Sequence, residues 1–157
     1  MLKISGAGID LIKESEGFRG EVYLDCVGVK TCGYGHALKP GESFPDGITE
    51  VTATLLLLKD VQTAEDAVSR MVKVTLTQGQ YDALVDFVYN LGEGRLASST
   101  LLKLLNEGKY DQAGQQLLVW CNAGGKPQPG LVKRRKAELA LWRTPDPPEP
   151  TPAAVSA

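Results

Sequence analysis

The segment 16–36 constrains the fold of this chain more than any other part of its 157-residue sequence. It holds two acids and a hydroxyl, Glu16, Asp25 and Thr31, among closely spaced glycines. Hydrolysis of a glycosidic bond requires an acid that gives a proton and an ionised carboxylate that activates water or acts as a nucleophile. Two neighbouring acids mean little in a chain with 19 Asp and Glu. Their place in this glycine-rich segment is the informative observation.

The local sequence predicts how these groups are held. Residues 5–15 have the apolar spacing of a helix, with Ser5 as its N-cap and Gly17 as its end. Glu16 then lies at the helix C-terminus, where the helix macrodipole disfavours an ionised carboxylate, a position that suits a proton donor. Valines and tyrosines alternating with glycines predict short antiparallel strands over residues 18–36, with a turn near Gly28.

Helices follow along the rest of the chain. Thr49 opens a long helix over residues 49–72, and Thr77 with Gln80 forms a capping box for a helix over 78–91, which Gly92 ends. Shorter helices are predicted over 99–106, 111–120 and 130–142. The long helix is expected to bury one stripe of apolar residues; these are Leu55, Leu58, Val61, Ala64, Ala67, Val68 and Met71.

These elements predict a mainly helical α+β fold with two lobes. Residues 1–143 form one domain, with a small β lobe over 16–48, a connecting helix over 49–72 and a helical lobe over 73–143. From residue 144 prolines alternate with polar residues, so 144–157 are expected to form a disordered or polyproline tail. A cleft between the lobes is the expected site for an extended sugar polymer.

The segment 16–36 resembles the N-terminal signature of the phage-type lysozymes, glycoside hydrolase family 24. It reads E-G-x(5)-Y-x-D-x(2)-G-x(2)-T-x-G-x-G-H, and Glu16, Asp25 and Thr31 match the catalytic spacing of that family. Residues 76–92 resemble the central helix of the family, and Trp120 with residues 130–135 resembles its C-terminal part. The resemblance covers roughly residues 5–143 and implies the lysozyme fold.

The resemblance also implies roles for individual residues. Glu16 is the proton donor, and Asp25 with Thr31 holds and activates water, with inversion at the sugar. His36 forms an ion pair with an acid of the long helix, for which Asp60 is the best-placed residue. An arginine near the C-terminus approaches Glu16, and the residues that fit are Arg134 and Arg135, between which the sequence leaves the choice open.

Residues that bind substrate are harder to identify. The candidates are Gly35, Tyr89 and Asn90. A tyrosine ring can stack on a sugar, and an amide can bind an N-acetyl group. A core tyrosine and a helix-terminal asparagine are nearly as compatible with the sequence.

Composition bounds the function further. A net charge of −2 gives no global attraction to nucleic acid or to an anionic wall. The longest apolar run, residues 55–58, is far shorter than a membrane span of roughly 20 residues, so no stable membrane insertion is expected. The three cysteines, Cys26, Cys32 and Cys121, are expected to be free thiols rather than a disulfide, and no metal or other cofactor is implied.

Taken with the resemblance, these features predict a monomeric endolysin. It would cleave the β-1,4 bond between N-acetylmuramic acid and N-acetylglucosamine in peptidoglycan and so lyse the host. It would accumulate in the host cytoplasm and reach the periplasmic wall through a holin-type membrane lesion. The alternatives are a catalytically silent wall-binding or virion structural module on the same fold, and a chitin-cleaving enzyme.

Overall fold

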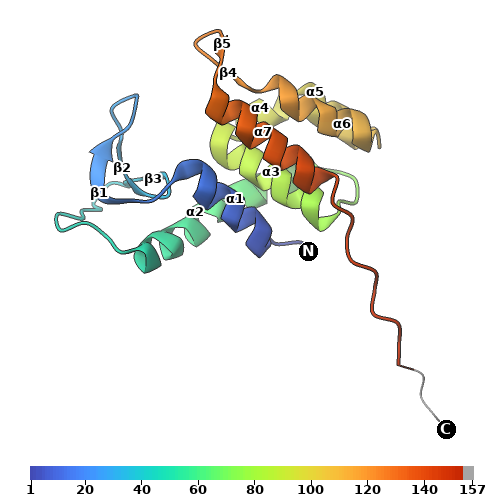
Figure 1. The fold of residues 1–157 in the computed structure, drawn as a ribbon, viewed down its shortest axis with the longest axis horizontal. Coiled ribbons are helices and arrows are strands. Elements are labelled where there is room, and N and C mark those ends of the chain that lie inside the picture. The colour runs from blue at the N-terminus through green and yellow to red at the C-terminus, as the bar shows by residue number, and fades with distance from the viewer. Residues whose placement is uncertain (154–157) are drawn as a thin grey trace.

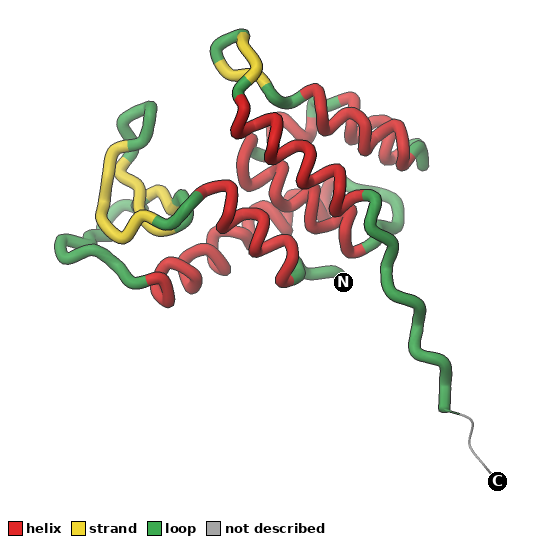
Figure 2. The backbone as a smooth tube through the Cα atoms, viewed as in Figure 1, coloured by secondary structure: helices red, strands yellow, loops and turns green. Residues whose placement is uncertain are grey.

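A computed structural model describes residues 1–153 of the chain, which form a small β lobe and a larger helical lobe (Figures 1 and 2). The long helix α2 runs beneath the sheet toward the helical lobe. In chain order the elements are α1 (Gly6–Glu16), β1 (Arg19–Leu24), β2 (Lys30–Gly33), β3 (His36–Ala37), α2 (Glu50–Met71), α3 (Gln78–Leu91), α4 (Glu93–Ala97), α5 (Thr100–Asn106), α6 (Tyr110–Gln116), the 3₁₀ helix η1 (Leu117–Val119), β4 (Asn122–Ala123), β5 (Lys126–Pro127) and α7 (Pro129–Trp142). The predicted α+β fold with two lobes is confirmed.

The β lobe is a three-stranded antiparallel sheet in the order β1-β2-β3. Tyr23 of β1 pairs with Thr31 of β2, and an irregularity in the register lies between Arg19 and Tyr23. The predicted turn forms at Gly28, whose φ of 83° favours glycine. The sheet therefore carries Asp25 at the end of β1 and Thr31 in the middle strand, on either side of one turn.

The central helix of the other lobe is α3, which packs against α7, α2, α1 and α4. The predicted capping box of Thr77 and Gln80 is confirmed, and Gly92 ends the helix with a φ of 90°. Residues 81–88 are all buried. The helix is thus buried nearly all round, and acids on it lie inside the protein.

The predicted apolar stripe of α2 was wrong at two positions. Leu55 and Leu58 are 60% and 43% exposed, whereas Ala53 and Leu57 are each 1% exposed. A run of four leucines is compatible with several helical faces, so spacing alone did not identify the buried one. From Val61 onward the prediction is correct apart from Met71, which is only partly buried.

The C-terminal part departs from the prediction in three ways. The helix expected over 111–120 ends at Gln116 and continues as η1, the short helix α4 was not expected, and a hairpin of β4 and β5 precedes α7. Gly124 and Gly125 both have positive φ, of 60° and 77°. This is the backbone that a tight two-residue hairpin turn requires, so the Gly-Gly pair was a readable signal.

Residues 144–153 carry no helix or strand. The start of this segment still contacts the helical lobe: the Gln78 amide donates to Asp146 Oδ1 at 2.8 Å, and Thr144 Oγ1 donates to the Ala140 carbonyl at 2.9 Å. The final four residues of the expected tail, 154–157, lie outside the described residues.

Candidate active site

A hollow of about 680 Å³ lies between the β lobe and the helices. Its walls come from the end of α1, the turn after β1, the loop around β3, α2 and the end of α3. The sequence-predicted site residues that line it are Glu16, Asp25, Gly35, Asp60, Tyr89 and Asn90. The structure thus brings together both candidate catalytic carboxylates and all three candidate substrate contacts.

Glu16 is the last residue of α1, and Arg134 from α7 holds it. Arg134 Nη1 donates to Glu16 Oε1 at 2.8 Å, while Nε and Nη2 donate to the two carboxylate oxygens of Asp86 at 3.0 and 2.8 Å. Burial opposes the charge of Arg134, but the hydrogen bonds and charge of Asp86, with those of Glu16, raise the pKa of the guanidinium overall. The permanent charge of Arg134 is therefore balanced largely by Asp86, which is 0% exposed.

The turn between β2 and β3 packs directly on Glu16. Gly35 has a φ of 75°, and a Cβ at this position would lie 2.9 Å from Glu16 Oε2. Tyr89 donates its hydroxyl hydrogen to the Tyr34 carbonyl at 2.7 Å, which fastens this turn to α3. Tyr89 therefore has a structural partner as well as a place in the wall of the hollow.

Asp25 is held by its own turn. Its Oδ1 accepts hydrogen bonds from the amides of Val27 and Val29 at 2.9 and 2.8 Å. No hydrogen bond to Oδ2 is found in the described structure, so this oxygen can serve a ligand or water. Asp25 is partly exposed, in contrast to the buried acid behind Arg134.

Thr31 is buried, at 5% exposed. Its Oγ1 donates to the Val29 carbonyl at 2.9 Å, so the same oxygen retains lone pairs that can accept a hydrogen. Thr31 does not belong to the lining of the hollow. The structure places it next to the Asp25 turn through Val29, which both side chains contact.

His36 on β3 links the sheet to α2. Its Nδ1 lies 2.6 Å from Asp60 Oδ2, and its Nε2 lies 3.0 Å from Glu42 Oε1. Burial alone would lower the pKa of His36, but the hydrogen bonds and charges of Asp60 and Glu42 raise it overall. Glu42, which the sequence did not single out, has a lowered pKa because the Lys39 amide donates to it, aided by His36.

Arg135, the other candidate partner of Glu16, points elsewhere. Its Nη2 donates to Asn90 Oδ1 at 2.7 Å. Because a guanidinium can only donate, the amide oxygen of Asn90 must face Arg135 and its nitrogen must face away. Asn90 lines the hollow. The site therefore contains a side-chain amide whose oxygen is held by Arg135 and whose N–H groups remain available to donate.

Sequence reasoning missed Asp86, although a signal existed. Asp86 precedes Asn90 by one helical turn, so the side chains of these two residues share a face of α3. The arginine pair Arg134-Arg135 meets this face from α7. A charged residue on the face of a strongly apolar helix indicates a buried partner.

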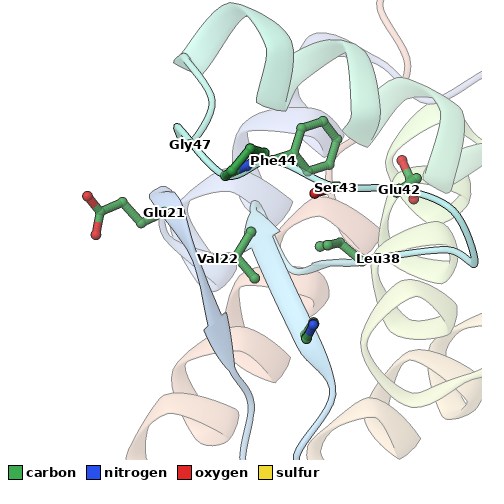
Figure 3. A pocket seen from close by; sticks show the side chains of 9 residues that line it. Glu21, Val22, Leu38, Glu42, Ser43, Phe44 and Gly47 are labelled. Atoms are coloured by element: carbon green, nitrogen blue, oxygen red, sulfur yellow. The ribbon is translucent and has the colours of Figure 1, made fainter.

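A second hollow, of about 410 Å³, lies on the β lobe and shares no lining residue with the first. Figure 3 shows Val22, Leu38 and Phe44 around it, with Glu21 projecting away from the strand. Glu42 in its wall is already engaged by His36 and by the Lys39 amide. This hollow contains neither candidate catalytic acid.

Among residues 1–153 no group of three or more His, Cys, Asp or Glu side chains is arranged to hold a metal ion. None of the helices in this part of the chain has the length and apolar character needed to cross a membrane.

The two lobes, with carboxylates from each lining one cleft, define a protein of the lysozyme class. The sequence profile of the phage lysozyme family matches residues 13–138, and the chain belongs to this family. The chain is 41% identical to the endolysin of Salmonella phage P22, over 90% of this chain and 99% of that protein. It is 46% identical to the endolysin of Bacillus phage B103, over 91% of this chain but only 55% of that protein, so the chain spans about half the length of this relative.

Solved structures agree with this assignment. A P22 lysozyme variant superposes with a TM-score of 0.83 at 39% identity, covering 92% of this chain and all of that one. The muramidase domain of SpmX from Asticaccaulis excentricus superposes with a TM-score of 0.85 at 34% identity, with the same coverage.

Proposed function

We propose that this protein is an endolysin that hydrolyses the β-1,4 bond between N-acetylmuramic acid and N-acetylglucosamine in bacterial peptidoglycan. One observation carries the proposal: Glu16 and Asp25 line the same cleft in a member of the phage lysozyme family. Although the sequence assigned residue 16 to the β lobe, Glu16 ends α1, which packs against α3 and α7, so it belongs with the helical lobe and lies opposite Asp25 of the β lobe. The P22 relative, which this chain matches along nearly its whole length, is named an endolysin. Membership of the family and the two-sided acid pair together favour glycoside hydrolysis over binding alone.

Glu16 is the general acid in this proposal. It gives its proton to the oxygen of the leaving sugar, and the hydrogen bond from Arg134 to Oε1 orients the carboxyl group. Asp86 balances the charge of Arg134. The contact with Gly35 limits where Oε2 can lie, because this turn leaves no room for a side chain.

Asp25 and Thr31 act on water at the other face of the sugar ring. Oδ1 of Asp25 is committed to two amides of its turn, which leaves Oδ2 for a water molecule. Thr31 supplies a second oxygen near this turn. Two groups that bind water favour direct attack by water and inversion at the anomeric carbon, because a nucleophilic Asp25 would not need the second group.

Substrate binding falls to the wall formed by α3. With its oxygen held by Arg135, Asn90 presents its amide hydrogens to the cleft and can donate to the carbonyl of an N-acetyl group. Tyr89 and Gly35 lie beside it in the same wall. This donor gives the cleft a preference for N-acetylated sugars.

Access to the wall is a separate step. We propose that the chain accumulates in the host cytoplasm and crosses through a holin-type lesion, an expectation that rests on the family resemblance. Expression of this chain in a host, with and without chemical permeabilisation, tests the route. Lysis only after permeabilisation is expected, whereas lysis without it would show that the chain is exported by another route.

Digestion of purified peptidoglycan tests the activity itself. The expected products are muropeptides that carry N-acetylmuramic acid at the reducing end, identified by mass after borohydride reduction. No cleavage would favour the silent wall-binding module, and stronger cleavage of chitin than of peptidoglycan would favour the chitinase alternative. Glu14 is an exposed residue on the same helix as Glu16, so Glu14→Gln is the matched control for the variants described below.

A further inference from the structure

Among residues 1–153, the lining of the active-site cleft contains one cationic side chain, that of Lys39. The acids in the same lining are Glu16, Asp25, Asp60 and Glu93. The chain as a whole carries a net charge of −2, so it offers an anionic ligand no general attraction. An anionic group that enters this cleft can therefore be attracted only by a local cation, and Lys39 is the one that the lining provides.

The acids of the cleft already have partners within the protein. Three of them lie against basic side chains, in the pairs Glu16–Arg134, Asp60–His36 and Glu93–Arg70. Asp25 accepts hydrogen bonds from the amides of its own turn. Lys39 differs from these residues, because it takes part in none of the ion pairs formed within the described part of the chain. It is also exposed, so its ammonium group is free to bind a ligand.

The segment after β3 presents Lys39 to the cleft. Ala37 and Lys39 line the cleft, whereas Leu38 between them lines the second hollow, where Figure 3 shows it. This alternation is that of an extended chain, in which successive side chains point to opposite sides. The Leu38 amide donates to the Lys30 carbonyl at 2.9 Å, which continues the pairing with β2 beyond the end of β3. The local backbone thus places Lys39 on the cleft side of the β lobe.

The backbone of Lys39 is held by the contacts of His36. The Lys39 amide donates to Glu42 Oε1 at 2.6 Å, and the same oxygen lies 3.0 Å from His36 Nε2. His36 Nδ1 in turn lies 2.6 Å from Asp60 Oδ2 on α2. The point from which the Lys39 side chain extends is therefore fixed relative to α2, while its charged end has no partner in the described structure.

The proposed substrate carries carboxylates on only one of its two sugars. N-acetylmuramic acid differs from N-acetylglucosamine by a lactyl ether, whose carboxyl group is either free or joined to an acidic peptide. Chitin consists of N-acetylglucosamine alone and has no such carboxylate. A cation in the cleft can therefore distinguish peptidoglycan from chitin, which the two acids at the glycosidic bond cannot do.

We propose that Lys39 is a specificity-determining residue that binds a carboxylate of the N-acetylmuramic acid unit, either that of the lactyl group or that of the peptide attached to it. The proposal rests on the proposed function, since it concerns the substrate of the same cleft. Lys39 binds the substrate away from the bond that is cleaved, so its loss should raise KM and leave kcat nearly unchanged. Ion pairs at exposed sites are weak, so the expected change in KM is about two- to fivefold.

Cleavage of two peptidoglycan preparations tests this role. One preparation is native, and in the other the carboxylates are converted to neutral methylamides with a carbodiimide and methylamine. The wild type is expected to have a KM about two- to fivefold higher on the neutralised polymer, whereas Lys39→Met should have the same raised KM on both. Lys39→Arg keeps the charge and should retain the wild-type difference between the polymers. The control Lys30→Met removes a charge from an exposed residue of the same lobe that does not line the cleft, and it should also retain the difference.

Each outcome decides the proposal. If Lys39→Met still shows the wild-type difference between the two polymers, or if Lys30→Met loses it equally, Lys39 does not bind the carboxylate, although the proposed function stands. If the wild type cleaves neither polymer, the proposed function fails and the role of Lys39 fails with it. Glycan stripped of its peptide by an amidase keeps only the lactyl carboxylate. An effect of Lys39→Met that persists on this glycan assigns the contact to the lactyl group, and an effect that disappears assigns it to the peptide.

Discussion

The two candidate catalytic acids are held by different physical means. In the helical lobe, Glu16 is oriented by Arg134, which comes from 118 residues along the chain and is backed by the buried Asp86. In the β lobe, Asp25 is oriented by amides of its own turn, two and four residues away. The proposed proton donor, placed by long-range charged contacts, therefore faces a carboxylate placed by local backbone. The first arrangement ties catalysis to global stability, whereas the second does not.

The largest expected effect is the loss of the proton donor. Glu16→Gln keeps the shape of the side chain and can still accept a hydrogen bond from Arg134. Peptidoglycan cleavage is expected to fall about 10²–10⁴-fold, the usual contribution of general acid catalysis. Initial rates of muropeptide release measure this, with Glu14→Gln as control, and near-wild-type cleavage would refute the role of Glu16.

Removing Arg134 should damage stability as well as activity. Arg134→Met leaves Asp86 buried without its partner, and such changes destabilise by about 3–5 kcal/mol. Urea unfolding followed by circular dichroism measures the loss, with the exposed neighbour change Lys133→Met as control. The double variant Asp86→Asn with Arg134→Met is expected to recover part of the loss. An unfolding free energy unchanged in Arg134→Met would contradict the contrast between the two lobes.

The β lobe also has a buried ionic contact of its own, in which His36 lies between Asp60 and Glu42. Its contribution to stability can be compared with that of Arg134 in the helical lobe. The folded-state pKa of His36 is raised, so its stabilisation is fully present below the unfolded value of about 6.5 and fades as pH rises through the folded value. Asp60→Asn is expected to destabilise by about 1.5–3 kcal/mol at pH 5, as for a hydrogen bond to a charged group, and by less at high pH. Glu42→Gln should cost less, because Glu42 is more exposed and its contact is longer. Melting temperatures from pH 5 to pH 9 test this, and an equal loss for Asp60→Asn at every pH would exclude the charged pair.

The smallest expected effect on stability belongs to Asp25. In Asp25→Asn the amide oxygen can still accept from Val27 and Val29, so the free energy of unfolding should change by no more than about 0.5 kcal/mol. Cleavage should nevertheless fall about 10²-fold or more, because a neutral amide cannot take a proton from water. A stability loss as large as that of Arg134→Met would show that both acids are held alike.

The same contrast explains how far the sequence alone could go. The helix ending at Gly17, the turn at Gly28 and the capping box at Thr77 depend on local chemistry, and the structure has each of them. The choice between Arg134 and Arg135 depends on how α7 sits against α1 and α3, which adjacent positions in one sequence do not encode. For the same reason the buried face of α2 was misplaced at Leu55.

The candidate site divides in the same way. The motif from Glu16 to Thr31 was legible because its residues lie close together in sequence. Asp86 and Glu42 were not, because each has its role only through residues that other elements bring to it. Asp86 carried a readable signal on an apolar helix face, whereas nothing in the sequence marks Glu42 as a partner of His36.

The anomeric form of the first product tests most directly the claim that Glu16 and Asp25 act from opposite faces with water between them. Proton NMR of a soluble peptidoglycan fragment, recorded in the first minutes of cleavage, distinguishes the two anomers before they equilibrate. Direct attack by water activated by Asp25 predicts the α-anomer as the first product. Appearance of the β-anomer first, or a sugar covalently attached to Asp25, would contradict it.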